Sequence, residues 1–333
     1  MDTPLIISAS RTKDMVHRSP GLLAKLLLGE ADCRWGPYAP FGRIDPAAIH
    51  SIVLWTKDPH ALISHPDLNQ TLWLLKKRFN VQIALQITAT GFGGSFIEPG
   101  IPRWESVVET VQRIFQSGLI QPQATVYRFD PFLKIHTPGG RCISNINFPI
   151  FETLSRAFIN LGIKRVTTSR ADAVRYPMVA QRLAGFNLTL DDFEEQEAFR
   201  FCQMVDADCQ HKEADFSICC EPQHPTLLKW GCIDGRWLNQ TKGSAFPRAT
   251  EILHNKIGRQ RPACRCTYSR DIGYSTGSKT CFSGGFGCLY CYSQGSANPP
   301  HLEKIIAEIA DFDRHPQDYL KAKGLHPSLH CAP

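Results

Sequence analysis

The sequence predicts an α/β protein built on a partial or complete TIM-like (β/α) barrel of about six β/α units, followed by a Cys-rich C-terminal cluster segment. Short β-branched, apolar runs alternate with amphipathic helical patterns through the first two thirds of the 333 residues. Most of these runs are almost continuously apolar, which is typical of parallel strands covered by helices. From about residue 222 the composition changes to Cys, Gly, Ser and aromatic residues, with few strand signals.

Each expected strand coincides with one apolar run. The six runs are residues 5–10, 51–57, 81–88, 124–130, 164–169 and 214–220. Helical stripes separate them within residues 68–79, 107–118, 151–162 and 191–205, and a last amphipathic helix covers 302–312. A doubly wound sheet is the alternative, because the pattern alone does not show whether the strands close into a barrel.

The chain divides into two parts by composition. Residues 1–221 are expected to form the barrel core, and residues 222–333 a Cys-rich segment with the C-terminal helix, packed on the barrel as one structural domain. The net charge of +6 is mild for this length, so it permits an acidic or phosphate-bearing substrate without requiring one. No stretch approaches the ~18 consecutive apolar residues of a membrane helix, and the N-terminus lacks the basic region of a signal peptide. We therefore expect a cytoplasmic protein without a membrane partner.

Polar side chains recur where expected strands end. In a β/α barrel the catalytic groups lie at the carboxyl ends of the strands, so these residues are the catalytic candidates. They are Arg11, Asp14, Trp55, Lys57, Arg128 and Asp130. Alternatively, each caps its strand or forms an ion pair such as Arg128–Asp130, because charges within apolar strands are costly unless paired. Their recurrence at the same end of successive units favours a polar mouth that faces the substrate.

The cysteines are unevenly distributed. Five of the 13 lie within residues 264–291, and the run CFSGGFGCLYCYS covers 281–293. Cys288 and Cys291 form a C-x-x-C pair, and with Cys281 they provide three thiolates, which suits a [4Fe–4S] cluster with one open iron. Gly284, Gly285 and Gly287 give the backbone the freedom to wrap closely around sulfur. A zinc ribbon, for example on Cys264, Cys266, Cys288 and Cys291, and a redox dithiol are the alternatives.

The segment SRDIGYSTGSKTCFSGGFGCLYCYSQ resembles the cluster-binding segment of the spore photoproduct lyase-like branch of radical S-adenosylmethionine enzymes. In that branch, glycine and cysteine are followed by three residues, a cysteine, two residues, a cysteine, a tyrosine and a small residue. Cys281, Cys288 and Cys291 match, with Tyr290 and Tyr292 beside the last cysteine, although the first gap here has six residues instead of three.

Most of the remaining chain resembles a bacterial domain-of-unknown-function family that is labelled by analogy with DNA repair photolyases. The matching pieces are ISASRTKD, IVLWTKDP, YRFDP, CCE, GCID and CRC. The cluster loop lies near the C-terminus instead of after the first strand, as in a circularly permuted barrel. Six β/α units also match the partial barrel of that superfamily.

The resemblance implies a radical S-adenosylmethionine enzyme that uses a [4Fe–4S] cluster on Cys281, Cys288 and Cys291. Reductive cleavage of S-adenosyl-L-methionine would start radical chemistry on a substrate that the sequence does not identify, either a small molecule or a nucleic acid. Ser8, Tyr290 and Tyr292 are the candidate cofactor contacts. The electron would come from a partner of the flavodoxin or ferredoxin type.

A second set of thiols, Cys219, Cys232, Cys264 and Cys266, is expected to hold a second Fe–S cluster or a zinc ion, since C-x-C with two distant cysteines can close a tetrahedral site. Buried structural thiols are the alternative. Two other functions remain open from the sequence. One is a β/α-barrel hydrolase with a structural zinc site, and the other is a non-catalytic, zinc-containing nucleic-acid-binding protein.

Overall fold

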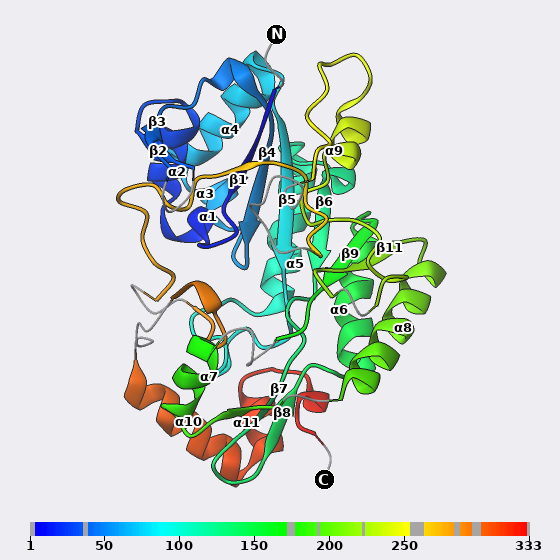
Figure 1. Cartoon of the computed structure of the whole chain (residues 1–333). Helices are drawn as coiled ribbons and strands as arrows, with labels where there is room; N and C mark the ends of the chain where they lie inside the picture. The colour runs from blue at the N-terminus through cyan, green and yellow to red at the C-terminus, as the bar shows by residue number, and fades with distance from the viewer. Residues whose placement is uncertain are drawn as a thin grey trace.

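A seven-stranded parallel sheet flanked by helices forms the centre of the computed structural model (Figure 1). The structure describes residues 4–35, 39–171, 177–191, 194–221, 224–253, 263–282, 287–294 and 301–331. None of the helices in these ranges is both long enough and apolar enough to cross a membrane.

The six expected strands are confirmed, and a seventh is added. The strands are β1 (Leu5–Ala9), β4 (Ile49–Thr56), β5 (Gln82–Thr88), β6 (Thr125–Arg128), β9 (Arg165–Thr168), β11 (Asp215–Ile218) and β12 (Arg270–Asp271). Their order across the sheet is β11-β9-β6-β5-β4-β1-β12, so the first six follow the chain without the reversal of a doubly wound sheet. Among the described residues, β11 and β12 are the two edges of this sheet.

Helices lie between the strands of the main sheet and after β12. They are α1 (Met15–Arg18), α2 (Pro20–Leu27), α3 (Ala61–Ser64), α4 (Pro66–Arg78), α5 (Trp104–Ser117), α6 (Phe148–Asn160), α7 (Pro177–Ala184), α8 (Glu195–His211), α9 (Gly235–Lys242), α10 (Leu302–Arg314) and α11 (Pro316–Ala322). The five helical stripes correspond to α4, α5, α6, α8 and α10. Gly118 ends α5 with a left-handed φ of 77°, a conformation that glycine adopts without steric cost.

Several short elements were not expected from the sequence. They are β2 (Cys33–Arg34), β3 (Phe41–Gly42), β7 (Lys134–His136), β8 (Cys142–Ser144), β10 (Thr189–Leu190) and the 3-10 turns Pro46–Ala48, Pro122–Ala124, Tyr292–Gln294 and Pro327–Leu329. The antiparallel sheet β10-β7-β8 lies beside α10 and α11, the last two helices of the chain (Figure 1). A disulfide joins Cys142 in β8 to Cys331.

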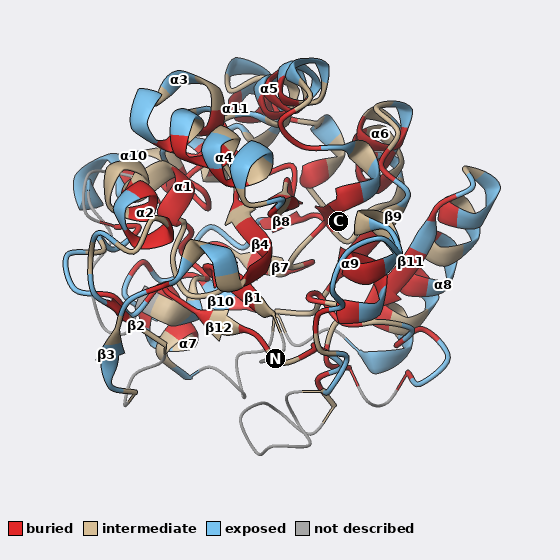
Figure 2. Ribbon diagram, turned by 90° about the horizontal axis from the view of Figure 1, so that it is seen from above, coloured by how far each residue is buried: buried red, intermediate tan, exposed pale blue. Residues whose placement is uncertain are grey.

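The two faces of the main sheet are covered by different parts of the chain, because successive side chains of a strand point to opposite faces. On one face, Ile7, Ile52 and Leu85 belong to the large core that includes the helices. On the other face, Ile6, Val53, Ala84 and Val126 pack with thiols and apolar side chains of the Cys-rich segment. The strands at the centre are therefore largely buried, while the helices around them have exposed outer surfaces (Figure 2).

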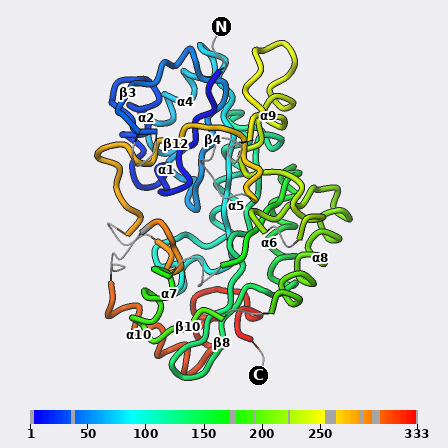
Figure 3. Tube along the Cα trace, viewed as in Figure 1, coloured from blue at the N-terminus to red at the C-terminus, as the bar shows by residue number. Residues whose placement is uncertain are grey.

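Strand β12 attaches the Cys-rich segment to the first strand of the chain. Ser8 pairs with Asp271 in the parallel ladder, and the trace of this late segment runs beside the N-terminal part of the chain (Figure 3). The Asp271 carboxylate accepts hydrogen bonds from Ser8 Oγ at 2.8 Å, Ser10 Oγ at 2.7 Å, and the backbone N–H groups of Arg11 at 2.8 Å and Gly273 at 3.0 Å. A two-residue strand has no hydrophobic periodicity, so the sequence pattern does not reveal it.

Replacing Asp271 by Asn should lower the free energy of unfolding by about 2–3 kcal/mol, because an amide cannot accept all four hydrogen bonds of a buried carboxylate. Urea denaturation of the variant and the native chain measures this difference. The control is Glu109→Gln on the exposed side of α5, which should change the stability by less than about 0.5 kcal/mol. Equal stability of the Asp271 variant and the native chain would show that this carboxylate does not hold β12 in place.

Candidate functional site

A cavity of about 1280 Å³ opens at the carboxyl ends of the strands. Its wall is formed by residues that follow β1, β4, β6, β9 and β11, together with the Cys-rich segment. All six catalytic candidates from the sequence line it, namely Arg11, Asp14, Trp55, Lys57, Arg128 and Asp130. This arrangement agrees with the expected group of polar residues at the carboxyl ends of the strands.

The cavity also collects the thiols. All seven predicted metal ligands line it: Cys219, Cys232, Cys264, Cys266, Cys281, Cys288 and Cys291. Cys220 lines it as well and was not among the candidates, although its position next to Cys219 was a signal in the sequence. These residues come from four segments between residues 219 and 291, so the Cys-rich part of the chain supplies one wall of the cavity.

Charged groups that follow β1 and β4 lie near Cys281, Cys288 and Cys291. The backbone N–H of Asp14 donates to Cys281 Sγ at 3.4 Å. Burial, followed by the nearby Asp14 carboxylate, raises the pKa of Cys281 to about 12. Burial also raises the pKa of Cys288 well above its ordinary value, and the ammonium group of Lys57 opposes this shift. Cys281 and Cys288 each interact electrostatically with Cys291.

A buried carboxylate fixes one side of the C-x-x-C loop. Glu98 is only 1% exposed, and its Oε1 accepts hydrogen bonds from Lys57 Nζ and Thr90 Oγ1, each at 2.8 Å, and from the Tyr290 hydroxyl. The Lys57 ammonium also lies 5.6 Å from the centre of the Tyr290 ring. Tyr290 lies between Cys288 and Cys291, so these contacts hold the loop against the end of β4. No sequence pattern indicates Glu98, which lies in a connection without periodicity.

An arginine fixes the other side of the same loop. Arg182 in α7 is buried, and its Nη1 donates to the carbonyl oxygens of Leu289 at 3.0 Å and Cys291 at 2.7 Å. The backbone N–H of Leu289 in turn donates to the carbonyl of Ile97 at 2.9 Å. At Gly287, a Cβ atom would lie 2.4 Å from the Phe282 ring, so the close approach there requires glycine. Gly284 and Gly285 lie outside the described residues.

Asp14 has the contacts of a structural residue. Its Oδ1 accepts from the backbone N–H of His17 at 3.0 Å, as the N-cap of α1. Its Oδ2 accepts from Thr56 Oγ1 and from the backbone N–H of Lys57, both at 2.9 Å. The carboxylate therefore joins the end of β4 to the loop after β1 and orients the N–H that reaches Cys281.

Arg11, Trp55, Arg128 and Asp130 form a second polar group in the cavity. Arg128 is 6% exposed, pairs with Asp130, and lies with its guanidinium 4.9 Å from the centre of the Trp55 ring. Arg11 lies 5.9 Å from the same ring centre and donates to Ser269 Oγ at 3.0 Å. The ion pair that was the structural alternative is thus present, and both of its members line the cavity.

The three candidate cofactor contacts differ in position. Tyr290 and Tyr292 line the cavity, and Tyr292 is half exposed with its hydroxyl 3.3 Å from the carbonyl of Arg11. Ser8 is fully buried within β1 and is not a lining residue. Because its hydroxyl donates to Asp271, Ser8 connects β1 to β12.

The other five thiols that line the cavity form a ring of neighbouring side chains. Cys219 contacts Cys232, with 3.3 Å between the sulfur atoms, and also Cys220. Cys266 contacts Cys232 and Cys264, and Cys264 contacts Cys220. These five residues are called the thiol ring below. The four predicted second-site ligands therefore lie together, with Cys220 added.

The thiol groups are close to one another but are not arranged as a formed metal site. Within the ranges that the structure describes, no three His, Cys, Asp or Glu side chains are placed as ligands of one metal ion. The donor chemistry nevertheless fits. Three thiols with nearby N–H and ammonium groups match a cluster with an open iron, and the five thiols of the ring exceed the four that a tetrahedral site requires.

Residues 6–293 match the protein family described as Domain of unknown function (DUF1848). This range includes the seven strands of the main sheet, apart from the first residue of β1, and all eight thiols that line the cavity. No curated protein and no solved structure matches the chain.

Replacing Arg182 by Met should loosen the Cys288–Cys291 loop, because two buried carbonyl groups lose a charged donor. We expect a loss of about 1.5–3 kcal/mol in the free energy of unfolding, and faster hydrogen exchange at residues 288–291. Arg113→Met on the exposed side of α5 is the matched control and should leave both quantities unchanged. Native exchange rates in the Arg182 variant would show that another contact fixes the loop.

Proposed function

We propose that this chain, which belongs to the protein family described as Domain of unknown function (DUF1848), is an iron–sulfur enzyme of the radical S-adenosylmethionine type. One observation carries the proposal. Cys281, Cys288 and Cys291 line the same cavity as the charged residues at the carboxyl ends of the strands. We further propose that the parallel strands β1, β4, β5, β6, β9 and β11 form a partial β/α barrel. Catalysis would take place at the carboxyl ends of these strands.

The three thiolates would hold a [4Fe–4S] cluster and leave one iron open. When bound, this cluster would supply the electron that cleaves a carbon–sulfur bond of S-adenosylmethionine. The cavity of about 1280 Å³ exceeds the roughly 300–1,000 Å³ of a typical small-molecule site, so it has room for a cofactor and a substrate together.

The chain's own residues have separate tasks in this proposal. Arg182 and the group of Glu98, Lys57 and Tyr290 hold the C-x-x-C loop against the sheet, so that Cys288 and Cys291 stay at the wall of the cavity. The backbone N–H of Asp14 donates to Cys281 Sγ, and this hydrogen bond partly offsets the rise in the pKa of Cys281 that burial and the Asp14 carboxylate cause.

The second polar group is suited to bind the ends of the cofactor or the substrate. Arg128 and Arg11 offer guanidinium donors to a carboxylate, since planar guanidinium groups bind carboxylates in a bidentate way. Asp130 and the Trp55 ring offer a negative charge and an aromatic face to a cation such as a sulfonium. Half-exposed Tyr292 lies at the side of this group.

The proposal requires an electron donor of the flavodoxin or ferredoxin type and leaves the substrate as a small molecule or a nucleic acid. The mild net charge of +6 is compatible with either.

Anaerobically purified protein should be brown, contain iron, and produce 5′-deoxyadenosine from S-adenosylmethionine when dithionite is added. Replacing Cys281, Cys288 or Cys291 by Ala should each abolish this activity and remove the iron of the open site, because each change deletes one of three ligands. Iron analysis and chromatography of the nucleoside product measure the two effects. Cys202→Ala, a buried thiol of α8 outside the cavity, is the control and should keep both. A colourless protein that contains only zinc would overturn the proposed function.

Replacing Asp130 by Ala should lower cofactor cleavage on the order of 100-fold while the iron content stays native, because Arg128 loses the partner that orients it. The measurements are the initial rate of nucleoside release and the iron content per chain. Asp191→Ala, which removes an ion pair with Lys134 in the small sheet, is the matched control. Unchanged rates in the Asp130 variant would exclude this polar group from the reaction.

A further inference from the structure

The thiol ring is assembled from three segments that are distant in the sequence. Cys219 and Cys220 follow β11, Cys232 precedes α9, and Cys264 and Cys266 precede β12. Each member contacts two others, so the ring closes on itself. We propose that this ring is a second metal site, distinct from the Cys281–Cys288–Cys291 site, and that it binds a single zinc ion through four thiolates.

The distance between sulfur atoms selects the kind of metal centre. Thiolates around one zinc ion, with zinc–sulfur bonds near 2.3 Å, lie about 3.8 Å from each other. Thiolates on the corners of a [4Fe–4S] cluster lie about 6–7 Å apart, since each is bonded to a different iron. The sulfurs of Cys219 and Cys232 are 3.3 Å apart, which is nearer to the spacing around a single ion than to that of a cluster, so one ion requires this pair to separate by about 0.5 Å.

The backbone is built for this close approach. A Cβ atom at Gly231 would lie 2.4 Å from the carbonyl carbon of Arg265 and 2.5 Å from the nitrogen of Cys266, so only glycine permits the contact that places Cys232 beside Cys266. Cys220 has a φ of 59°, a left-handed conformation that is uncommon for a residue other than glycine and is often found at functional sites. The backbone N–H of Cys266 donates to Cys264 Sγ at 3.4 Å, which fixes the relative position of these two residues.

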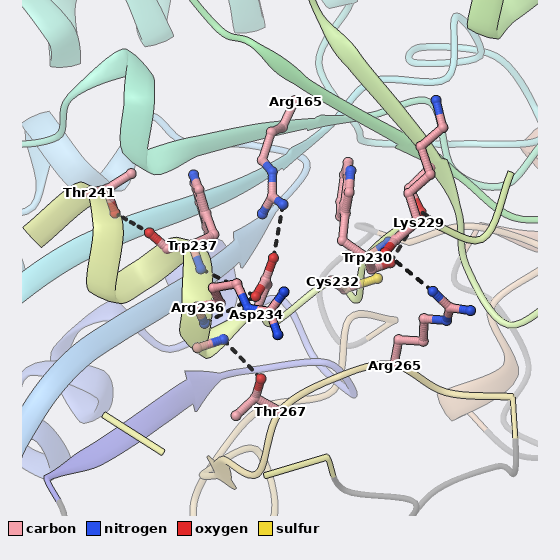
Figure 4. A network of polar contacts seen from close by, with 12 residues as sticks. Arg165, Lys229, Trp230, Cys232, Asp234, Arg236, Trp237, Thr241, Arg265 and Thr267 are labelled. Carbon is pink, nitrogen blue, oxygen red and sulfur yellow. Dashed lines mark hydrogen bonds and ion pairs between the residues drawn. The ribbon is translucent and has the colours of Figure 1, made fainter. Parts of the chain in front are cut away.

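A polar network fixes the segments that carry Cys232 and Cys266 (Figure 4). Asp234 caps the start of α9 through the N–H groups of Arg236 and Trp237 and pairs with Arg165 at 2.8 Å. The N–H of Gly235 donates to Thr267 Oγ1 at 2.8 Å. Thus the residues that follow Cys232 and Cys266 are joined to each other and to β9, which limits how far these two thiols can move.

Two guanidinium groups lie beside the thiol ring. Arg128 Nη1 donates to Cys232 Sγ at 3.0 Å, and the Arg11 guanidinium interacts electrostatically with Cys232, Cys264 and Cys266. N–H donors to sulfur are the outer contacts that metal-bound thiolates require. On the other side the ring belongs to an apolar cluster with Ile233 and Leu238, which limits the access of water. When zinc binds, four thiols release their protons to solvent and no electron is transferred.

Zinc and iron content per chain, measured by mass spectrometry on the purified full-length protein, tests the proposal. We expect about one zinc per chain in the native protein, and a loss of at least tenfold in zinc when Cys232 or Cys266 is replaced by Ser. The matched control is Cys209→Ser, which replaces a buried thiol of α8 outside the thiol ring. This variant should keep its zinc. Gly231→Ala should also lower the zinc content, since it separates the segments without removing a thiol.

A second measurement does not depend on the folding of the variants. Native protein stripped of zinc and titrated with Co²⁺ should develop the intense visible bands of a tetrahedral cobalt thiolate, at one equivalent. Absence of these bands, a disulfide between Cys219 and Cys232 found by peptide mapping, or loss of iron instead of zinc in the ring variants would each overturn the proposal.

The outcome is separable from the proposed enzymatic function. The triple variant Cys281→Ala, Cys288→Ala, Cys291→Ala should lose cofactor cleavage and the iron of the open site but retain one zinc per chain. If this variant retains its zinc and the native chain never cleaves S-adenosylmethionine, the zinc site stands and the radical function fails. If the native chain cleaves the cofactor but holds no zinc, the function stands and the zinc site fails.

Discussion

The attachment of β12 to β1 through Asp271 is the constraint on which the rest of the structure depends. One buried carboxylate accepts from two hydroxyl groups and a backbone N–H of residues 8–11, and from Gly273 in its own segment. This holds the Cys-rich segment over the end of the first strand. It brings the loop that carries Cys281, Cys288 and Cys291 to the end of the sheet, where Glu98 and Arg182 then hold it.

The charged residues of the cavity are neutralised in two separate groups. Near Cys288, the ammonium of Lys57 is balanced by Glu98, and the same carboxylate binds Tyr290. Near Cys232, the guanidinium of Arg128 is balanced by Asp130 and contacts sulfur directly. Buried charges are tolerated only when they are paired in this way. The pairing therefore maintains two sets of thiols, each with a nearby cation, in one cavity.

Much of the fold could be predicted because its strands and helices follow from local periodicity. The runs at 51–57 and 81–88 became β4 and β5, and the stripe ended by Gly118 became α5. Local patterns also placed Arg128, Asp130 and Lys57 at strand ends, where the sheet geometry then grouped them. In contrast, β12 and the small sheet β10-β7-β8 have strands of two or three residues, too short to show a period.

The sequence by itself determined the order of the parallel strands' apolar runs, the polar residues at their ends and the unusual density of cysteines. Only the tertiary structure decided which thiols are neighbours. Cys264 and Cys266 were candidates to join Cys288 and Cys291 in a zinc ribbon, yet they contact Cys220 and Cys232. The physical reason is that thiol contacts depend on where β11, α9 and β12 bring their flanking loops, and on the close backbone approach at Gly231. These are long-range packing relations, which residue spacing does not encode.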